Sequence, residues 1–341
     1  MDALLPESVI HCVEEGQDLS MEQMENAVDG VMQGRFTDAQ IERLLLGLRR
    51  KGETVAEVAG AAAAIRRHAT VIHSRRTGIL DTCGTGGDGA KTLNISTAAA
   101  LVAAAAGATV AKHGNRGVSS RSGSADVLAA LGVNIEAGPD CVQRCLDELG
   151  IAFCYAPLLH PAMKRVAAVR RKLGVPTIFN LLGPLANPAR ASYQLIGVGR
   201  PALRPLLAEA LAMLGTQRAA VVHSDDGMDE VSLGDVTHVT LVAEGRLSEI
   251  ALSPEDLGLP RWRRDALVVE GPEQSAAVIR EVLGGSRGAA RDVIVANAAV
   301  ALWVAGRAAT PALGVEPASQ AIDSGSAAVL LARLAEYTHA K

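Results

Sequence analysis

The sequence predicts an α/β protein with a small all-helical domain, residues 1–75, and a larger domain, residues 76–341, whose mostly parallel central sheet is flanked by helices. Residues 1–75 carry three helix-start motifs and no strand-like run. From Gly78 onward, short apolar runs alternate with Ala-rich segments and Gly-rich loops, as in strands joined by helical crossovers. The length of 341 residues also favours two domains.

The helical region is marked by three capping boxes, in which a hydroxyl accepts a hydrogen bond from a helix-start amide and a later side chain reaches back. The pairs are Ser20 with Gln23, Thr37 with Gln40, and Thr54 with Glu57. The helix that follows Thr37 has an apolar stripe at helical spacing and ends at Gly52. Segment 165–188 changes from helical to loop-like, and we expect part of it to pack on this domain.

Five short apolar runs are predicted strands of the sheet. They are residues 79–81, 109–111, 152–155, 195–198 and 219–223. Because helical segments separate them, the strands are expected to run parallel. Residues 237–243 and 247–251, joined by Glu244 and Gly245, predict an antiparallel hairpin at one edge of the sheet.

The overall composition argues against nucleic-acid and membrane partners. The formal net charge is −4 and aromatic residues make up 2% of the chain, so neither general attraction to polyanions nor base stacking is favoured. The charge-free stretch 92–111 has the length of a membrane span, but polar residues and Gly107 interrupt it, which indicates a buried helix running into a strand. The N-terminus does not resemble a signal peptide, and the five cysteines form no CxxC pair. We therefore expect a cytoplasmic protein with reduced thiols.

A glycine-rich loop, residues 81–89, follows the first predicted strand directly. Its four glycines allow positive φ and bring backbone amides close to an anion; they are Gly84, Gly86, Gly87 and Gly89. The loop also satisfies GxGxxG, but a dinucleotide fold expects an acidic residue about 20 positions further on. No Asp or Glu lies between Asp88 and Asp126, so the fingerprint for NAD is weak.

Two hydroxyl-rich segments follow, one strand–helix–strand unit apart. Residues 92–97 open the Ala-rich helix, where amides and hydroxyls meet at a helix N-terminus. Residues 112–124 form a second such loop. All charged residues from Gly89 to Ala125 are positive: Lys91, Lys112, Arg116 and Arg121. The two segments together predict a polyphosphate site.

An acidic loop supplies candidate metal ligands. Residues 224–230 hold four carboxylates, those of Asp225, Asp226, Asp229 and Glu230. Hard oxygen ligands suit Mg²⁺, which typically binds a few carboxylates together with substrate phosphates. The loop therefore predicts a Mg²⁺ site beside the polyphosphate.

Read together, these segments resemble the anthranilate phosphoribosyltransferase family from the N-terminal helices to the C-terminal helix. The matching stretches are GTGGDG (84–89), NIST (94–97), KHGNR (112–116), SSRSGSAD (119–126), HPAMKRVAAVR (160–170), TIFNLLGPLANP (177–188) and GMDEVS (227–232). The resemblance implies a helical domain and an α/β domain with the active site in the hinge cleft, and a homodimer. It also implies transfer of phosphoribosyl from phosphoribosyl pyrophosphate to anthranilate.

The resemblance places site residues on this chain. Phosphoribosyl pyrophosphate would contact Gly84, Gly87, Asp88, Thr92, Asn94, Ser96, Thr97, Lys112, Asn115, Ser119, Ser120 and Ser124. Mg²⁺ would be held by Ser96, Asp229 and Glu230. Anthranilate would contact Gly84, Asn115 and Arg170, with His160 and Met163 near its channel.

Three residues are the candidate catalytic groups. Lys112 and Mg²⁺ would neutralise charge that develops on the leaving pyrophosphate. The Arg170 guanidinium suits the carboxylate of anthranilate, and His113 is the candidate proton shuttle.

The chain departs from the family pattern near the acceptor motifs. Ala168 precedes Val169 where proline is common, Pro176 stands where arginine is frequent, and Met228 and Val231 replace two leucines. These differences bear on the aryl acceptor rather than on phosphoribosyl pyrophosphate.

Three alternatives remain open at this point. One is transfer to another aromatic amine, one is a nucleoside phosphorylase, and one is a non-catalytic relative that binds nucleic acid. Arsenolysis or phosphorolysis of a pyrimidine nucleoside would identify the second, and a salt-sensitive gel shift would identify the third.

Overall fold

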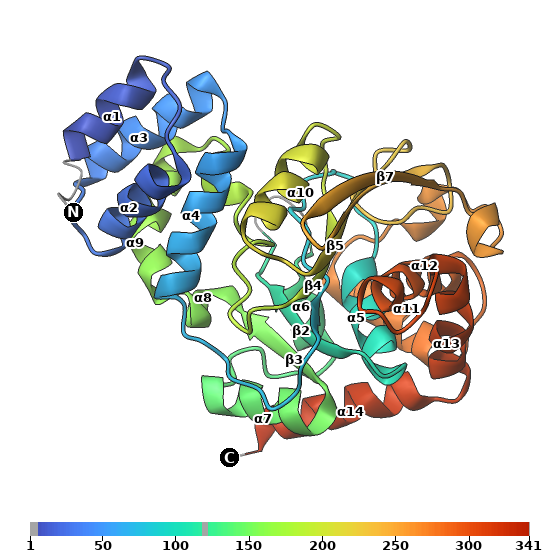
Figure 1. The fold of residues 1–341 in the computed structure, drawn as a ribbon. Helices are drawn as coiled ribbons and strands as arrows, with labels where there is room; N and C mark the ends of the chain where they lie inside the picture. Colours follow the sequence, from blue (N-terminus) through green and yellow to red (C-terminus); the bar gives the residue numbers. More distant parts are fainter. Residues whose placement is uncertain (1–5, 118–121, 341) are drawn as a thin grey trace.

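The computed structural model describes residues 6–117 and 122–340. Figure 1 shows a helical bundle beside a larger α/β body, with the C-terminal helix running along the far edge of that body. The predicted fold class, helices first and then a mostly parallel sheet with flanking helices, is confirmed.

The bundle consists of α1 (Pro6–Glu14), α2 (Met21–Met32), α3 (Asp38–Lys51) and α4 (Val55–His68). All three predicted capping boxes are present, at Ser20, Thr37 and Thr54. Gly52 ends α3 with φ 87°, a left-handed conformation that glycine adopts without a Cβ penalty. Helix α9 (Lys164–Leu173) packs against α3 although some 110 residues of chain lie between them.

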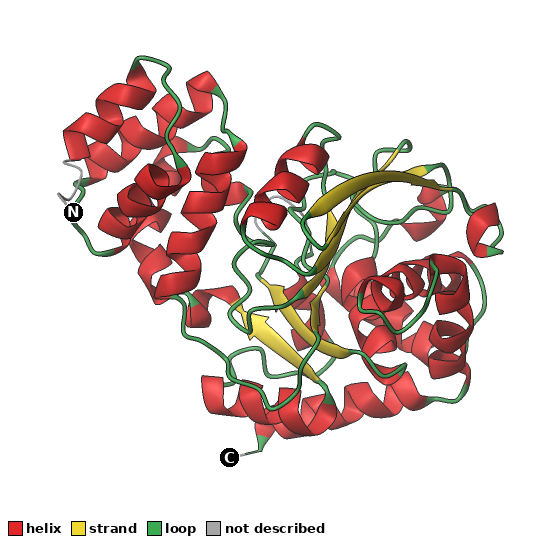
Figure 2. Ribbon diagram, in the orientation of Figure 1, coloured by secondary structure: helices red, strands yellow, loops and turns green. Residues whose placement is uncertain are grey.

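The sheet has seven strands in the order β3-β2-β1-β4-β5-β6-β7. They are β1 (Ile79–Asp81), β2 (Thr109–Gly114), β3 (Ile151–Tyr155), β4 (Tyr193–Gly197), β5 (Arg218–Ser224), β6 (Thr237–Ala243) and β7 (Arg246–Leu252). The first five pair in parallel, and β6 and β7 add an antiparallel hairpin at the β5 edge. All five predicted strands and the predicted hairpin are confirmed, and Figure 2 shows the long hairpin strands curving over the body.

The remaining α-helices surround this sheet. They are α5 (Ile95–Ala105), α6 (Ser124–Ala130), α7 (Pro139–Leu149), α8 (Ala156–Leu159), α10 (Leu203–Met213), α11 (Pro272–Leu283), α12 (Ala289–Val304), α13 (Pro311–Asp323) and α14 (Ser326–His339). The charge-free stretch forms the buried helix α5 and runs into β2, as predicted. Among the described residues, no helix has both the length and the apolar character needed to cross a membrane.

Alternating side chains of the central strands divide the core in two. On β5, Ala220 and Val222 join the cluster formed with α5 and α12, whereas Ala219 and Val221 join the cluster that contains α10 and the bundle. This follows from the two-residue side-chain period of a strand. The bundle core is thus continuous with one face of the sheet, and the boundary at residues 75 and 76 stays a prediction.

The strand order creates a switch point between β1 and β4. From β1 the chain crosses to β2 on one side, and it later returns to place β4 on the other side. In open α/β sheets, the crevice at the carboxyl ends of such strands is the usual ligand site. The glycine loop follows β1 and Gly197 ends β4, so both lie at this crevice.

Candidate active site

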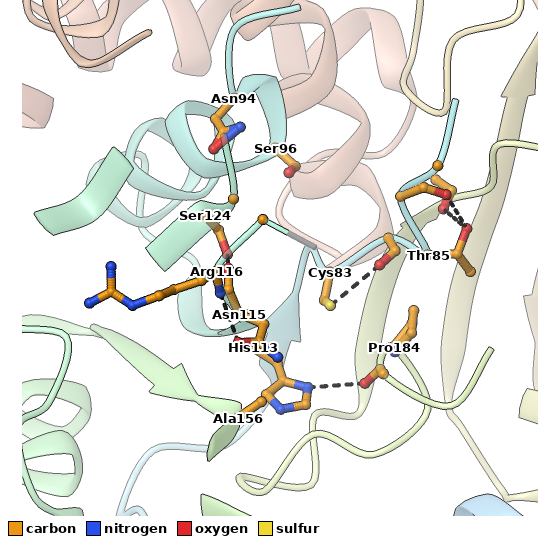
Figure 3. A pocket seen from close by; sticks show the side chains of 18 of the residues that line it. Cys83, Thr85, Asn94, Ser96, His113, Asn115, Arg116, Ser124, Ala156 and Pro184 are labelled. Atoms are coloured by element: carbon orange, nitrogen blue, oxygen red, sulfur yellow. Dashed lines mark hydrogen bonds between the residues drawn. The ribbon is translucent and has the colours of Figure 1, made fainter. Parts of the chain in front are cut away.

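A cavity of about 630 Å³ opens at the switch point. Its walls come from the glycine loop, the start of α5, the end of β2, α8 and α9, the loop after β5, and α4 of the bundle. Figure 3 shows Asn94 and Ser96 on one side of the cavity and His113 on another, directed toward the segment at Pro184.

The glycine loop packs directly on the end of β4. A Cβ added at Gly84 would lie 2.7 Å from the Gly197 carbonyl oxygen, and the Thr85 amide donates to that oxygen over 2.9 Å. Gly86 and Gly87 have φ of 65° and 89°. Glycine is therefore required here both by the close backbone approach and by the backbone conformation.

The acidic loop divides into two parts. Asp229 and Glu230 line the cavity, as predicted. Asp225 instead pairs with His238 at 3.0 Å, and Asp226 accepts a hydrogen bond from the Ser232 hydroxyl at 2.5 Å. Only two of the four clustered carboxylates therefore reach the site.

Asp88 completes a group of three carboxylates in the cavity. Its Oδ2 accepts from the Asp229 amide at 3.4 Å, and Glu230 Oε1 accepts from the Ser96 amide at 3.1 Å. Burial, together with the neighbouring carboxylates, raises the pKa of Asp229 well above its usual value. Burial also raises the pKa of Glu230 to about 7, with Lys112 opposing the shift. A divalent cation would stabilise the charged forms of these clustered carboxylates, which burial and mutual repulsion disfavour, so the group fits such an ion.

Gly197 fixes the position of the acidic loop. A Cβ on Gly197 would lie 1.5 Å from the Asp229 carbonyl oxygen, which no real contact allows. We expect Gly197→Ala to displace Asp229 and Glu230 and to destabilise the protein by about 1–3 kcal/mol or more, as overpacking does. The measurements are Mg²⁺-dependent turnover, which should be lost, and the midpoint of urea unfolding, which should be lower. Gly138→Ala is the control, because a Cβ there meets nothing within 4 Å; equal effects of the two changes would contradict the prediction.

Lys112 projects from β2 into the polar end of the cavity. Its Nζ donates to the Thr82 carbonyl at 3.1 Å, to the Thr82 hydroxyl at 3.2 Å and to the Ser96 hydroxyl at 3.4 Å. These three neutral acceptors hold the ammonium group without cancelling its charge. The charge remains available to an anion in the cavity.

The start of α5 offers further unsatisfied polar groups. Asn94 precedes the helix, and its Nδ2 donates to the Ser122 carbonyl at 3.1 Å. Asn94 Oδ1 and Thr97 Oγ1 are buried without a partner among the described residues. Buried polar atoms are nearly always satisfied in native proteins, so such groups indicate a ligand or water at this point.

Two buried histidines that line the cavity form a pair. His113 Nδ1 lies 3.0 Å from the Gly183 carbonyl oxygen, and the Nε2 atoms of His113 and His160 are 3.2 Å apart. Because a carbonyl only accepts, His113 Nδ1 carries the proton, and its Nε2 accepts from His160. His160 Nδ1 is then an unprotonated, buried acceptor without a partner among the described residues. Burial lowers the pKa of His113 to about 4 and that of His160 to about 3.

This pair makes folding sensitive to acid. The unfolded chain takes up a proton on each histidine below about pH 6.5, whereas the folded pair stays neutral until about pH 4. Stability contributed by His113 is therefore fully present above pH 6.5 and is lost as the pH falls toward 4, by about 2 kcal/mol between pH 7 and pH 5. Urea unfolding at the two pH values should show a smaller difference for His113→Gln than for the wild-type protein. An identical pH dependence in both proteins would refute this assignment.

Arg170 lies on α9, which packs against α2 and α3 of the bundle, whereas Lys112 lies on β2 of the sheet. Its guanidinium carbon is 5.8 Å from the centre of the Phe179 ring, and Nη2 donates to Asn180 Oδ1 at 3.4 Å. Burial lowers the pKa of Arg170. No ion pair joins it to a carboxylate within the described part of the chain. Met163, directly before α9, and Phe179, beside Arg170, also line the cavity, and we call this part of it the apolar end.

The cavity brings together nearly every site residue that the sequence predicted. Those in its lining are Gly84, Gly87, Asp88, Thr92, Asn94, Ser96, Thr97, Lys112, His113, Asn115, Ser124, His160, Met163, Arg170, Asp229 and Glu230. Ser119 and Ser120 lie outside the described residues.

Several residues that brace the site were not predicted. Asp81, at the end of β1, accepts from the His113 amide at 3.0 Å and from Asn187 Nδ2 at 2.7 Å. Asn187 Nδ2 also donates to the Ala111 carbonyl at 2.8 Å, so β1, β2 and the loop 181–190 are tied together. Asp81 is the first residue of the glycine loop. Its position at the end of a predicted strand is the sequence feature that could have indicated this role.

Asp81, Cys83 and His113 could by their positions form a metal site. The donors do not favour one, because both Asp81 oxygens accept from N–H groups and both ring nitrogens of His113 are engaged. Burial raises the pKa of the Cys83 thiol to about 12, which keeps it protonated. We assign this group a bracing role.

Comparison with known protein families identifies the class of protein to which the chain belongs. Residues 7–69 match the helical bundle domain of a glycosyl transferase family, and residues 76–328 match the a/b domain of the same family. The two matches together cover most of the chain, which therefore belongs to this glycosyl transferase family.

The relatives make the assignment specific. Anthranilate phosphoribosyltransferase from Rhodopirellula baltica is 50% identical over 94% of this chain and 94% of the relative, and that from Symbiobacterium thermophilum is 49% identical over 97% of both. The chain belongs to the anthranilate phosphoribosyltransferase family, which confirms the family and activity predicted from its motifs.

Solved structures agree with this assignment. Anthranilate phosphoribosyltransferase from Thermus thermophilus superposes with a TM-score of 0.92 at 41% identity, covering 97% of this chain and 99% of that one. The enzyme from Saccharomyces cerevisiae, in complex with PRPP and Mg, gives 0.88 at 28% identity over 99% and 98% of the two chains. The Saccharomyces enzyme has also been solved with 4-fluoroanthranilate, and that structure gives 0.87 at 26% identity over 99% of both chains.

Proposed function

We propose that this cavity binds phosphoribosyl pyrophosphate at its polar end and anthranilate at its apolar end, and joins them to give N-(5-phosphoribosyl)anthranilate and pyrophosphate in tryptophan biosynthesis. The observation that carries this proposal is the division of one cavity into two chemically different ends. Lys112, unsatisfied polar groups and three carboxylates occupy one end. An unpaired guanidinium and apolar side chains occupy the other.

The polar end suits a phosphorylated sugar. The glycine loop presents backbone amides, α5 directs its N-terminus at the cavity, and Lys112 adds a full positive charge. The orphaned Asn94 and Thr97 oxygens provide acceptors for ribose hydroxyls. Ser119 and Ser120 are proposed as further phosphate contacts only because they belong to the stretch SSRSGSAD, which matches the family.

Mg²⁺ would be held by Ser96, Asp229 and Glu230, with Asp88 beside them. The arrangement fits because the Ser96 amide already positions Glu230 Oε1 at 3.1 Å and the buried carboxylates need a compensating positive charge. When bound, the ion would neutralise pyrophosphate oxygens as the bond to the ribose breaks.

The residues of the chain account for the rest of the chemistry. As pyrophosphate departs from C1, Lys112 stabilises the growing negative charge, an effect worth about 3–4 kcal/mol for one well-placed donor. The amine of anthranilate is neutral near pH 7 and attacks without prior deprotonation. Arg170 holds its carboxylate, and this fixes the angle of attack.

After attack, the nitrogen must lose a proton. The His113–His160 pair is neutral across the physiological range and retains one free lone pair, on His160 Nδ1. We therefore assign proton uptake to His160 Nδ1, after which the proton on His160 Nε2 can pass to His113 Nε2.

The direct test is loss of anthranilate fluorescence on addition of phosphoribosyl pyrophosphate, with and without Mg²⁺. Mg²⁺-dependent loss is expected. Binding of phosphoribosyl pyrophosphate by calorimetry without any loss of fluorescence would leave the polar end in place and replace anthranilate by another aryl amine. If anthranilate fluorescence is not lost and phosphoribosyl pyrophosphate does not bind, the proposal is refuted.

We also propose a cytoplasmic homodimer. All five cysteines are free thiols, including Cys141 and Cys145 one turn apart on α7, which suits a reducing compartment. The dimer is proposed on the family resemblance alone. Light scattering should give twice the chain mass of 35.2 kDa, and a monomer would refute it.

A further inference from the structure

A second cavity, of about 480 Å³, is separate from the active site, and loop 181–190 contacts a lining residue of each: His113 in the active site and Arg66 in the second cavity. Its walls are the C-terminal part of α4, residues 190–192 before β4, and the turn 214–217 between α10 and β5. The two cavities have no lining residue in common. Because its walls come from α4 and from the segments that precede β4 and β5, the second cavity lies between the helical bundle and the sheet.

The second cavity contains three arginines, of which one is neutralised. Arg67 forms ion pairs with Glu25 and with Asp29, the latter at 3.3 Å. Arg66 and Arg190 have no ion pair with any acid in the described part of the chain. Arg66 is half-buried, and its Nε donates to the Leu185 carbonyl at 2.5 Å, which leaves its terminal nitrogens for a ligand.

The electrostatics of this cavity are unfavourable without a ligand. Burial, with a smaller contribution from Arg190, lowers the pKa of Arg66 to about 10. Like charges that share a recess repel each other, and a desolvated guanidinium loses its hydration without a carboxylate in return. A bound oxyanion would relieve both penalties.

The backbone at Arg190 is also unusual. Its φ is 52°, in the left-handed region that favours glycine, and its amide donates to the Asn187 carbonyl at 3.0 Å. A strained residue is retained where it places a side chain usefully. Here Arg190 lines the cavity together with Ser192 and Thr216, which carry hydroxyl groups.

We propose that the second cavity binds a small phosphate monoester between Arg66 and Arg190. Two uncompensated positive charges match the charge of a phosphate monoester, which is close to −2 at pH 7. Guanidinium groups offer paired N–H donors that fit phosphate oxygens, and hydroxyl groups complete the site. This site is separate from the one that the proposed function uses.

A ligand here would contact the wall of the active site through loop 181–190. The Gly183 carbonyl accepts from His113 in the active site, and two residues later the Leu185 carbonyl accepts from Arg66. The bound phosphate would also connect α4 of the bundle with the turn before β5.

Calorimetry with glycerol 3-phosphate, in EDTA and without acceptor, tests the proposal apart from catalysis. Glycerol 3-phosphate that binds at the active site should do so equally in all variants. A difference in affinity between variants therefore reports on the second cavity. Arg66→Gln and Arg190→Gln should each weaken one binding event about tenfold or more, because each removes a charged hydrogen-bond donor. Arg246→Gln, an exposed arginine on β7, is the charge-matched control and should bind as the wild type does.

Unchanged binding in both cavity variants would overturn the proposal, as would an equal loss in Arg246→Gln. If Arg66→Gln does not fold, Arg190→Gln carries the test alone, because the Arg190 side chain is exposed. Failure of the fluorescence assay would leave this result standing.

Discussion

Replacing Glu230 with glutamine is expected to lower kcat by roughly 10²–10³-fold, the usual effect of removing one group that stabilises transition-state charge. The change keeps the shape of the side chain and the acceptor that meets the Ser96 amide at 3.1 Å, and it removes only the negative charge. The Mg²⁺ concentration for half-maximal activity should rise as well. Asp229→Asn should act in the same direction, since both carboxylates line the cavity beside Asp88.

The measurement is a Mg²⁺ titration of turnover at saturating phosphoribosyl pyrophosphate. Asp225→Asn is the matched control, because this acid belongs to the same loop but pairs with His238 outside the cavity. A titration curve for Glu230→Gln that coincides with the wild-type curve would remove Glu230 from the metal site. Equal shifts in Glu230→Gln and Asp225→Asn would indicate a general effect of loop charge instead.

Local chemistry explains why much of this fold was predictable. The capping boxes at Ser20, Thr37 and Thr54 satisfy helix-start amides within a few residues, so they act wherever the helix packs. The glycine loop is similar, because positive φ at Gly86 and Gly87 is a requirement of the local backbone. The polar half of the site was predictable for the same reason.

Contacts between distant segments were not predictable in this way. Asp88 joins Asp229 across 141 residues, and Asn187 joins Asp81 across 106, because the strand order places β4 beside β1. Periodicity identifies strands but does not order them. The composition of the acidic loop alone does not separate Asp229 and Glu230 from Asp225 and Asp226, whose partners lie in β6 and in the following turn. The family resemblance selected Asp229 and Glu230, and these two line the cavity.

Replacing Arg170 with alanine is expected to raise KM for anthranilate by roughly 10–100-fold, the range for loss of a charged, paired hydrogen bond to a carboxylate. KM for phosphoribosyl pyrophosphate should change little, because Arg170 lies on α9 whereas Lys112 and its partners Thr82 and Ser96 belong to the sheet and to the start of α5. The Asn180 oxygen and the Phe179 ring orient the guanidinium without neutralising it. Arg170→Lys should recover only part of the loss, since an ammonium group cannot form the two-pronged contact.

The neighbouring Arg171→Ala is the matched control, because Arg171 is exposed on the same helix and does not line the cavity. Comparison with an aniline that lacks the carboxylate separates binding from folding. If Arg170 holds the carboxylate, removing the guanidinium should penalise anthranilate strongly and the carboxylate-free amine hardly at all. Equal penalties for the two amines would mean that Arg170 shapes the cavity wall, and recognition of the acceptor would then rest on its apolar lining. A penalty for anthranilate alone would show that specificity for the acceptor depends on the positive charge of Arg170, in the last turn of α9.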